Sequence, residues 1–157
     1  MDLLNYIEKG GAIVYLLIAL NIIGFTLIFW KFFTLLQKES LSRKILQKIN
    51  LTQNSDTQIE YEIKKLEFGL NFIKNIASIA PLLGLLGTVI GVLKAFEAIT
   101  ENGLGDPSIF STGISIALIT TIAGLIVAIP HHIAYNYFIG VLDELELKIK
   151  KETNERL

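Results

Sequence analysis

The chain contains no cysteine, which excludes disulfide bonds, thiolate metal ligands and a cysteine nucleophile. It is also poor in charge, because Asp, Glu, Lys and Arg make up 18% of its 157 residues while hydrophobic residues make up 52%. A water-soluble body of this size needs more polar surface than that. The formal net charge of −1 offers no positive field for nucleic acid. These shortages argue against a soluble enzyme and against a nucleic-acid-binding protein.

Three stretches carry no Asp, Glu, Lys or Arg at all, and they occupy residues 10–30, 75–93 and 107–142. A helix rises about 1.5 Å per residue, so about 20 apolar residues cross a hydrocarbon core of about 30 Å. We therefore predict three transmembrane helices, over residues 11–30, 75–100 and 108–130. The first follows Asp2 and Glu8 and is too long for a signal peptide, so we expect it to be retained.

Basic residues are distributed unequally between the two sides of these spans. Of the 14 Lys and Arg residues, all but Lys9 and Lys94 lie in residues 31–74 or in the tail after the third span. The positive-inside rule then places the N-terminus in the periplasm and the C-terminus in the cytoplasm. We expect an interfacial helix at residues 1–10, cytoplasmic helices in residues 31–74 and 131–157, and a tight periplasmic turn at residues 101–107.

The two cytoplasmic segments carry apolar residues at helical spacing. A polar string, NLTQNSD at residues 50–56, separates two such helices, and the second is expected to begin at Ser55 or Asp56 and to run without a break into the second span. Glu146 and Lys150 have the spacing of an ion pair on the last helix. An apolar stripe in water needs a partner. We favour packing between copies of the chain, with packing inside one chain as the alternative.

The second and third spans each carry a face of small residues. Such faces let helix backbones approach closely, which drives association inside a bilayer. We favour association of several copies around a central space, with plain packing inside one three-helix unit as the alternative. The residues are Gly84, Gly91 and Ala95 in the second span and Gly113, Ala117, Gly124 and Ala128 in the third.

Hydroxyl groups gather on the same faces, at Thr88, Thr120 and Thr121. A threonine inside a span often bonds only to a carbonyl of its own helix, so plain packing is one interpretation. The other interpretation is a pore lining, because a ring of hydroxyls offers donors and acceptors without the cost of about 2.5–3.5 kcal/mol for inserting a charged side chain. Such a ring can hold water or face an ionisable group from another protein.

Pro81 and Pro130 each cancel one helical hydrogen bond, and we favour a static kink over a hinge at both. His131 and His132 are adjacent, so on a helix they point about 100° apart and cannot chelate one metal. Histidine titrates near neutral pH, which suits a cytoplasmic proton exit, although interfacial histidines are usually bystanders. The chain lacks phosphate-binding and hydrolase motifs. We expect no enzyme activity, no cofactor and no metal site.

Two segments carry a family resemblance: APLLGLLGTVIGVLKAF at residues 80–96 and GISIALITTIAGLIVAIPHHIAYNYF at residues 113–138. Together they resemble the ExbB/TolQ/MotA family of proton-channel proteins. Three spans and a large cytoplasmic share are similar to ExbB and TolQ rather than to the four-span MotA. The resemblance implies an all-α, homo-oligomeric bundle, a pentamer with a central pore, in the inner membrane of a Gram-negative bacterium. The positions that match the family signature are Pro81, Gly84, Gly87, Gly91, Gly124 and Pro130.

The resemblance also implies partners. The pore would hold the single spans of an ExbD- or TolR-like protein with a membrane aspartate, which the family's threonines, here Thr88 and Thr121, would face. Proton flow would then energise a TonB-like protein for nutrient import across the outer membrane. A TolQ-like role in the cell envelope and a non-conducting scaffold are the alternatives. Many relatives carry a glutamate where this chain has Ile116, and the segment between the first two spans is short here.

Overall fold

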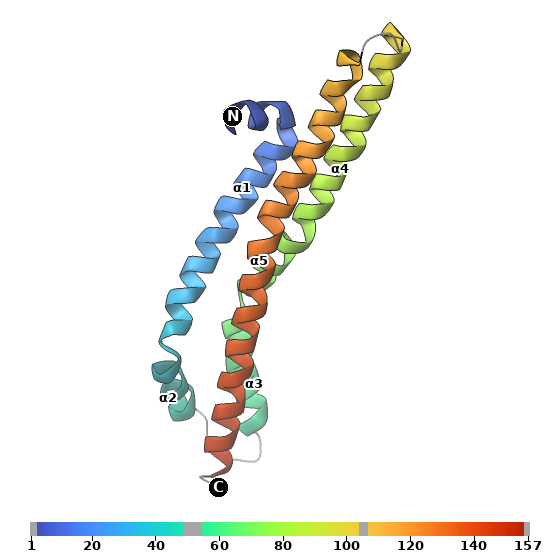
Figure 1. Ribbon diagram of the computed structural model, residues 1–157. Helices are drawn as coiled ribbons and strands as arrows, with labels where there is room; N and C mark the ends of the chain where they lie inside the picture. Colours follow the sequence, from blue (N-terminus) through green and yellow to red (C-terminus); the bar gives the residue numbers. More distant parts are fainter. Residues whose placement is uncertain (1–2, 49–54, 104–106, 156–157) are drawn as a thin grey trace.

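The computed structural model describes residues 3–48, 55–103 and 107–155. They form α1 (Leu3–Leu36), α2 (Lys38–Lys48), α3 (Ser55–Glu67), α4 (Leu70–Asn102) and α5 (Ser108–Asn154). Figure 1 shows α4 and α5 as a long antiparallel pair, with α1 along the other side of α5 and the short helices α2 and α3 beside the C-terminal half of α5. The molecule is therefore elongated, with its N-terminal and C-terminal segments far apart.

Three of these helices are long and apolar enough to cross a membrane, and they cover Leu4–Leu36, Leu70–Asn102 and Phe110–Asn154. This confirms the predicted all-helical class with three spans. The helices pack on one another through a buried cluster made of Leu17 on α1, Ile76 and Ala80 on α4, and Val127 and Ala128 on α5. Much of their remaining surface is exposed Leu, Ile, Val and Phe, which suits lipid or another helix rather than water.

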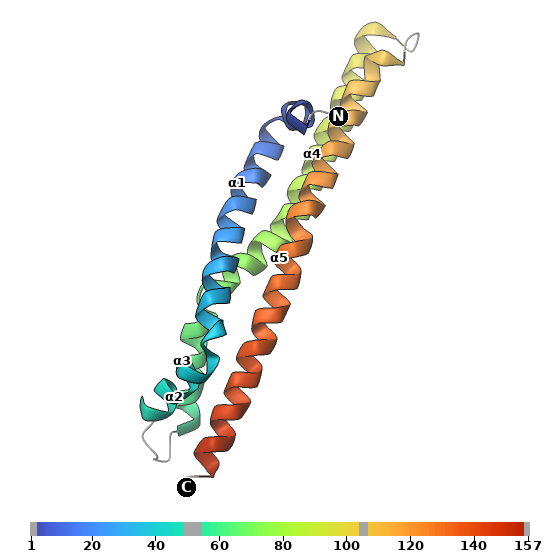
Figure 2. The ribbon, with the colours of Figure 1, turned by 60° about the vertical axis from the view of Figure 1, so that its left-hand side comes forward.

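The first helix is bent near its beginning. Gly11 has φ 64° and ψ −153°, values that interrupt the helical ladder and that only glycine adopts at low cost. The turns before Gly11 consequently lie across the end of the span instead of continuing it (Figures 1 and 2). Asp2 lies outside the described residues. The interfacial position of this segment in a membrane stays a prediction.

The helical segments outside the predicted spans, α2, α3 and the C-terminal part of α5, pack inside the chain. Their apolar stripes meet in a cluster of Ile45 on α2, Ile59 and Ile63 on α3, and Leu145 and Ile149 on α5, all buried. The interpretation that these stripes need a second copy is therefore wrong, because each stripe already covers the others. On the outside of this bundle the Lys150 ammonium donates to Glu146 at 2.6 Å, and this hydrogen bond raises the pKa of Lys150.

A second expectation fails at the junction of α3 with α4. The apolar period predicts one continuous helix from Ser55 into the second span, but α3 ends at Glu67 and α4 begins at Leu70. Gly69 separates them with φ 91°, in the left-handed region. Helices commonly end at a glycine in this conformation. Residues 50–54 of the polar string before α3 lie outside the described residues.

Candidate functional site

The α4–α5 pair is built on backbone contact. A β-carbon added to Gly91 would lie 2.6 Å from the backbone oxygen of Gly113, and one added to Gly124 would lie 2.6 Å from that of Ala80. A real β-carbon does not approach an oxygen so closely, so glycine is required at both positions. The small-residue faces at Gly84, Gly91, Gly113, Ala117 and Gly124 are thus buried within one protomer. Packing inside one three-helix unit is the interpretation that the structure shows for these faces.

Thr120 belongs to this internal interface. It is fully buried, and a β-carbon at Gly87 would lie 2.4 Å from its Cβ. Its hydroxyl lies 3.0 Å from the carbonyl oxygens of Ile116 and Ala117 on its own helix, to which it donates. Thr120 therefore fills the notch left by Gly87 and does not present its oxygen outward from the protomer.

Thr88 on α4 and Thr121 on α5 form a hydroxyl pair across the same interface. Their Oγ1 atoms lie 2.5 Å apart, and either hydroxyl can donate to the other. The Thr88 Oγ1 also lies 3.2 Å from the carbonyl oxygens of Gly84 and Ala117. Because each hydroxyl has one hydrogen and two lone pairs, the pair always keeps lone pairs available to a third group.

The hydroxyl pair lies in the seam where α4 meets α5, and it is partly open. Thr88 and Thr121 are half-buried, whereas Leu85 and Leu118, one turn away from each, are exposed. The pair is accordingly a polar spot on an apolar surface. Ile116, also half-buried, puts no carboxylate on this surface. A hydroxyl does not release its proton near neutral pH, so a titrating group would have to come from elsewhere.

The two adjacent histidines have different surroundings. His131 is fully buried, and its Nδ1 donates to the carbonyl oxygen of Val127 at 2.6 Å. Its Nε2 is buried with no hydrogen-bond partner and faces Gly24 of α1, where a β-carbon would lie 1.8 Å away. Phe25 contacts the ring edge-on at 5.2 Å between centroids. His132 is exposed, so the two rings share no site. A proton exit at these residues stays a prediction.

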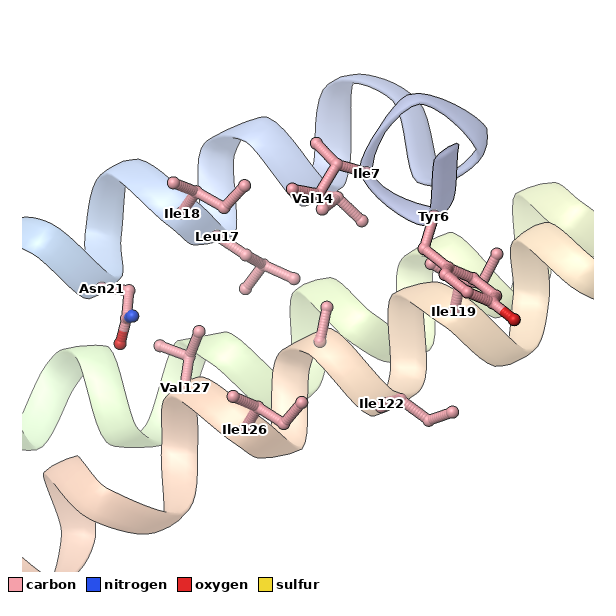
Figure 3. Close-up of a pocket in the computed structure, with 11 residues that line it drawn as sticks. Tyr6, Ile7, Val14, Leu17, Ile18, Asn21, Ile119, Ile122, Ile126 and Val127 are labelled. Carbon is pink, nitrogen blue, oxygen red and sulfur yellow. The ribbon is translucent and has the colours of Figure 1, made fainter. Parts of the chain in front are cut away.

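The contact between Gly24 and His131 closes α1 onto α5, and nearer the N-terminus α1 again lies against α5 at Gly10, where an added β-carbon would lie 3.2 Å from the Ile119 side chain. An apolar groove of about 540 Å³ lies between α1 and α5, under the bent first turns (Figure 3). Figure 3 shows Tyr6 of the bent segment above Ile119 of α5 and Asn21 at the opposite end of the groove. The Asn21 Oδ1 atom is buried without a hydrogen-bond partner. Leu17 and Val127, which line the groove, also belong to the buried cluster that joins the three spans.

The two prolines predicted as kinks or hinges lie inside helices. α4 runs through Pro81 and α5 through Pro130 without interruption, so neither proline ends its helix. Whether either acts as a hinge stays a prediction.

Over residues 3–48, 55–103 and 107–155, no group of three or more His, Asp or Glu side chains is arranged to hold a metal ion. The tight turn predicted at residues 101–107 includes residues 104–106, which lie outside the described part.

Comparison with known proteins identifies the family. Residues 31–151 match the MotA/TolQ/ExbB proton channel family, and this segment includes α2 to α4 and nearly all of α5. The chain belongs to this family. The match covers the small-residue interface, the hydroxyl pair and the bundle of α2, α3 and the C-terminal part of α5. The chain is accordingly a multi-pass membrane protein of a proton-channel family.

The chain is similar both to proteins named ExbB and to proteins named TolQ of the Tol-Pal system. A putative ExbB homologue of Methanothermobacter thermautotrophicus is 32% identical over 96% of the chain and 69% of its own length. The biopolymer transport protein ExbB of Aquifex aeolicus is 42% identical over 57% of the chain and 59% of its own length. The Tol-Pal system protein TolQ of Haemophilus influenzae is 36% identical over 62% of the chain and 40% of its own length. The chain thus matches only part of the length of each of these relatives.

Sequence reasoning missed three residues that organise the site's surroundings: Gly24, Lys31 and Gly69. Gly24 was one of several small residues in the first span, and the buried face of His131 gave no sequence signal. Gly69 follows Lys64 and Lys65, which is the order typical of a helix end. The continuous apolar period concealed that signal.

Proposed function

We propose that the chain is a subunit of a proton-driven motor in the inner membrane. Several copies would surround a central axis with the Thr88–Thr121 seam turned inward. A separate single-span protein in that axis would supply the titrating carboxylate. The observation that carries the proposal is the hydroxyl pair itself, which spans two helices and stays partly open on an otherwise apolar face.

The chemistry of the pair suits a carboxyl group that changes its protonation state. A protonated carboxyl can donate to a threonine oxygen, and a carboxylate can accept from a threonine hydroxyl. When the carboxylate is absent or protonated, the Thr88 hydroxyl can return its hydrogen to the carbonyl of Gly84 or Ala117, 3.2 Å away. Each state is therefore satisfied without burying a second charge, which suits a chain with Ile116 where many relatives have a glutamate.

The names of the relatives support a proposal about the partner and the task. Both ExbB-named and TolQ-named proteins are similar to the chain. We infer an ExbB-like role with an ExbD-like partner that drives a TonB-like protein. A TolQ-like role with a TolR-like partner is the second candidate, and a pentamer is the assembly we infer for either. In this arrangement the N-terminus is periplasmic and α2, α3 and the end of α5 are cytoplasmic.

The test is proton flux through the assembled complex. The chain is produced with an ExbD-like single-span protein and reconstituted into vesicles. A potassium diffusion potential then drives proton uptake, which an internal pH dye records. The double variant Thr88→Val and Thr121→Val should lower the flux about tenfold or more, because a hydrogen bond to a charged group is worth about 1.5–3 kcal/mol.

The control is Thr26→Val. Thr26 is another threonine within a span, and its hydroxyl donates only to Ile22 of its own helix at 2.8 Å. Its flux should equal that of the unchanged chain. If the double variant assembles with its partner and conducts as well as Thr26→Val does, the hydroxyl pair has no role in conduction and the scaffold alternative holds.

A further inference from the structure

The junction between α3 and α4 has a defined geometry. Gly69 has φ 91° and ψ −26°. Backbone hydrogen bonds form on both sides of it: the Phe68 amide donates to the carbonyl oxygen of Lys65 at 3.3 Å, and the Ile73 amide donates to that of Gly69 at 3.4 Å. Gly69 and Leu70 are both buried. The junction is therefore a packed corner, even though the apolar period of the sequence favours a straight helix through it.

Lys31 of α1 lies in this corner. Only 5% of the residue is exposed, and its Nζ donates to the carbonyl oxygen of Leu66 at 2.7 Å. Carbonyls in the last turn of a helix have no partner in their own helix and carry the negative end of the helix dipole. A buried ammonium is costly unless it is paired, and the carbonyl end of α3 provides that partner. A cation from another helix thus caps the broken end of α3.

The stem of the same side chain occupies the space beside Gly69. A β-carbon at residue 69 would lie 3.3 Å from the Lys31 Cε and 3.9 Å from the Trp30 ring. The ammonium also lies 5.4 Å from the centroid of the Trp30 ring, within range of a cation–π interaction. Lys31 consequently meets both requirements of the corner: it caps the freed carbonyl end and packs against the residue with positive φ.

We propose that Lys31 is a latch for the α3–α4 corner and so fixes the orientation of the bundle of α2, α3 and the C-terminal part of α5 relative to the spans. Without its charge, the carbonyl of Leu66 loses its donor and α3 gains by continuing into α4 as one helix. With the latch closed, movement of α4 at the hydroxyl pair passes to α3 through a rigid corner. The contacts of the corner lie within one protomer, so they can be tested without the partner protein and without proton flux.

The experiment measures a distance across the corner. The chain has no native cysteine, so spin labels attach only where cysteines are introduced. Glu60→Cys on α3 and Ser78→Cys on α4 replace exposed residues on either side of Gly69. Labelled chains are diluted with unlabelled chains in lipid bilayers so that only distances within one protomer are recorded. The unchanged corner should give one narrow distribution.

Two substitutions at Lys31 decide the role of the charge. Lys31→Met keeps the length of the stem and removes the donor, so the main distance should move to a longer value or a second, longer population should appear. Lys31→Arg keeps a cation and should preserve the original distribution. An unchanged distribution in Lys31→Met overturns the latch, as does a shift in Lys31→Arg as large as that in Lys31→Met.

Two glycine substitutions test the corner independently of the Lys31 variants, which matters if Lys31→Met does not fold. Gly69→Ala disfavours the positive φ and presses on the Lys31 stem, so it should shift the distance in the same direction. Gly103→Ala is the matched control, because Gly103 also has a positive φ, 80°, but a β-carbon there meets no atom within 4 Å. A corner distance unchanged by Gly69→Ala overturns the proposal.

Discussion

At the scale of single residues, the glycines show how local space decides the effect of one carbon atom. Gly91 lies against the backbone of α5, and a β-carbon there would lie 2.6 Å from the Gly113 oxygen and 2.7 Å from the Ala117 nitrogen. Gly140 lies in the same long helix as Gly113, but a β-carbon there has open space within 4 Å. The same substitution should therefore have opposite effects at these two positions.

Gly91→Ala should destabilise the protomer by about 1–3 kcal/mol, the usual cost of overpacking a close interface. Gly140→Ala should be neutral or stabilise it by up to about 1 kcal/mol, because alanine favours a helix more than glycine does. Reversible unfolding of the chain in mixed micelles measures both. Equal effects of the two substitutions would show that α4 and α5 do not approach as closely as the structure places them.

At the scale of elements, α1 is attached less extensively than α4 and α5 are to each other. Its buried contacts with the other spans include Leu17, in the cluster shared with α4 and α5, and Gly24 against His131. The groove of about 540 Å³ lies between α1 and α5 nearer the N-terminus. The Gly24–His131 contact should accordingly be a principal determinant of how α1 docks.

Gly24→Ala should weaken this docking by about 1–3 kcal/mol, because the new carbon would overlap the His131 ring. In a chain that already carries His131→Ala, the same substitution should cost less, since the ring is gone. A double-mutant cycle on unfolding free energies gives this difference, and contacting residues commonly couple by about 0.5–3 kcal/mol. Additive effects of the two substitutions would mean that the residues do not touch.

Sequence periodicity predicts the spans but not the corners. Long uncharged runs have one physical solution in a bilayer, so the three spans and the all-helical class follow directly. The corner at Gly69 packs against Lys31, 38 positions earlier, a contact that no local pattern contains. The pairing of Thr88 with Thr121 likewise requires the register of α4 on α5, which the close contacts of Gly91 and Gly124 set.

At the scale of the whole molecule, internal packing already covers the surfaces that the sequence offered for assembly. The small-residue faces join α4 to α5, and the apolar stripes of α2 and α3 join these helices to α5. Contacts between copies would therefore use other surfaces, such as the exposed apolar side chains of α4 and α5. On α4 these side chains include Leu82, Leu86, Val89 and Leu93, which are exposed in the protomer.

The central claim is that the seam bearing Thr88 and Thr121 faces the axis of a closed assembly, and label distances between protomers test it most directly. One spin label replaces Leu118, exposed on the seam beside Thr121, or Ile22, exposed on α1. In bilayers at full labelling, the distances between copies should be shorter for residue 118 than for residue 22. Shorter distances for residue 22, or no distance between copies at either position, would contradict the account.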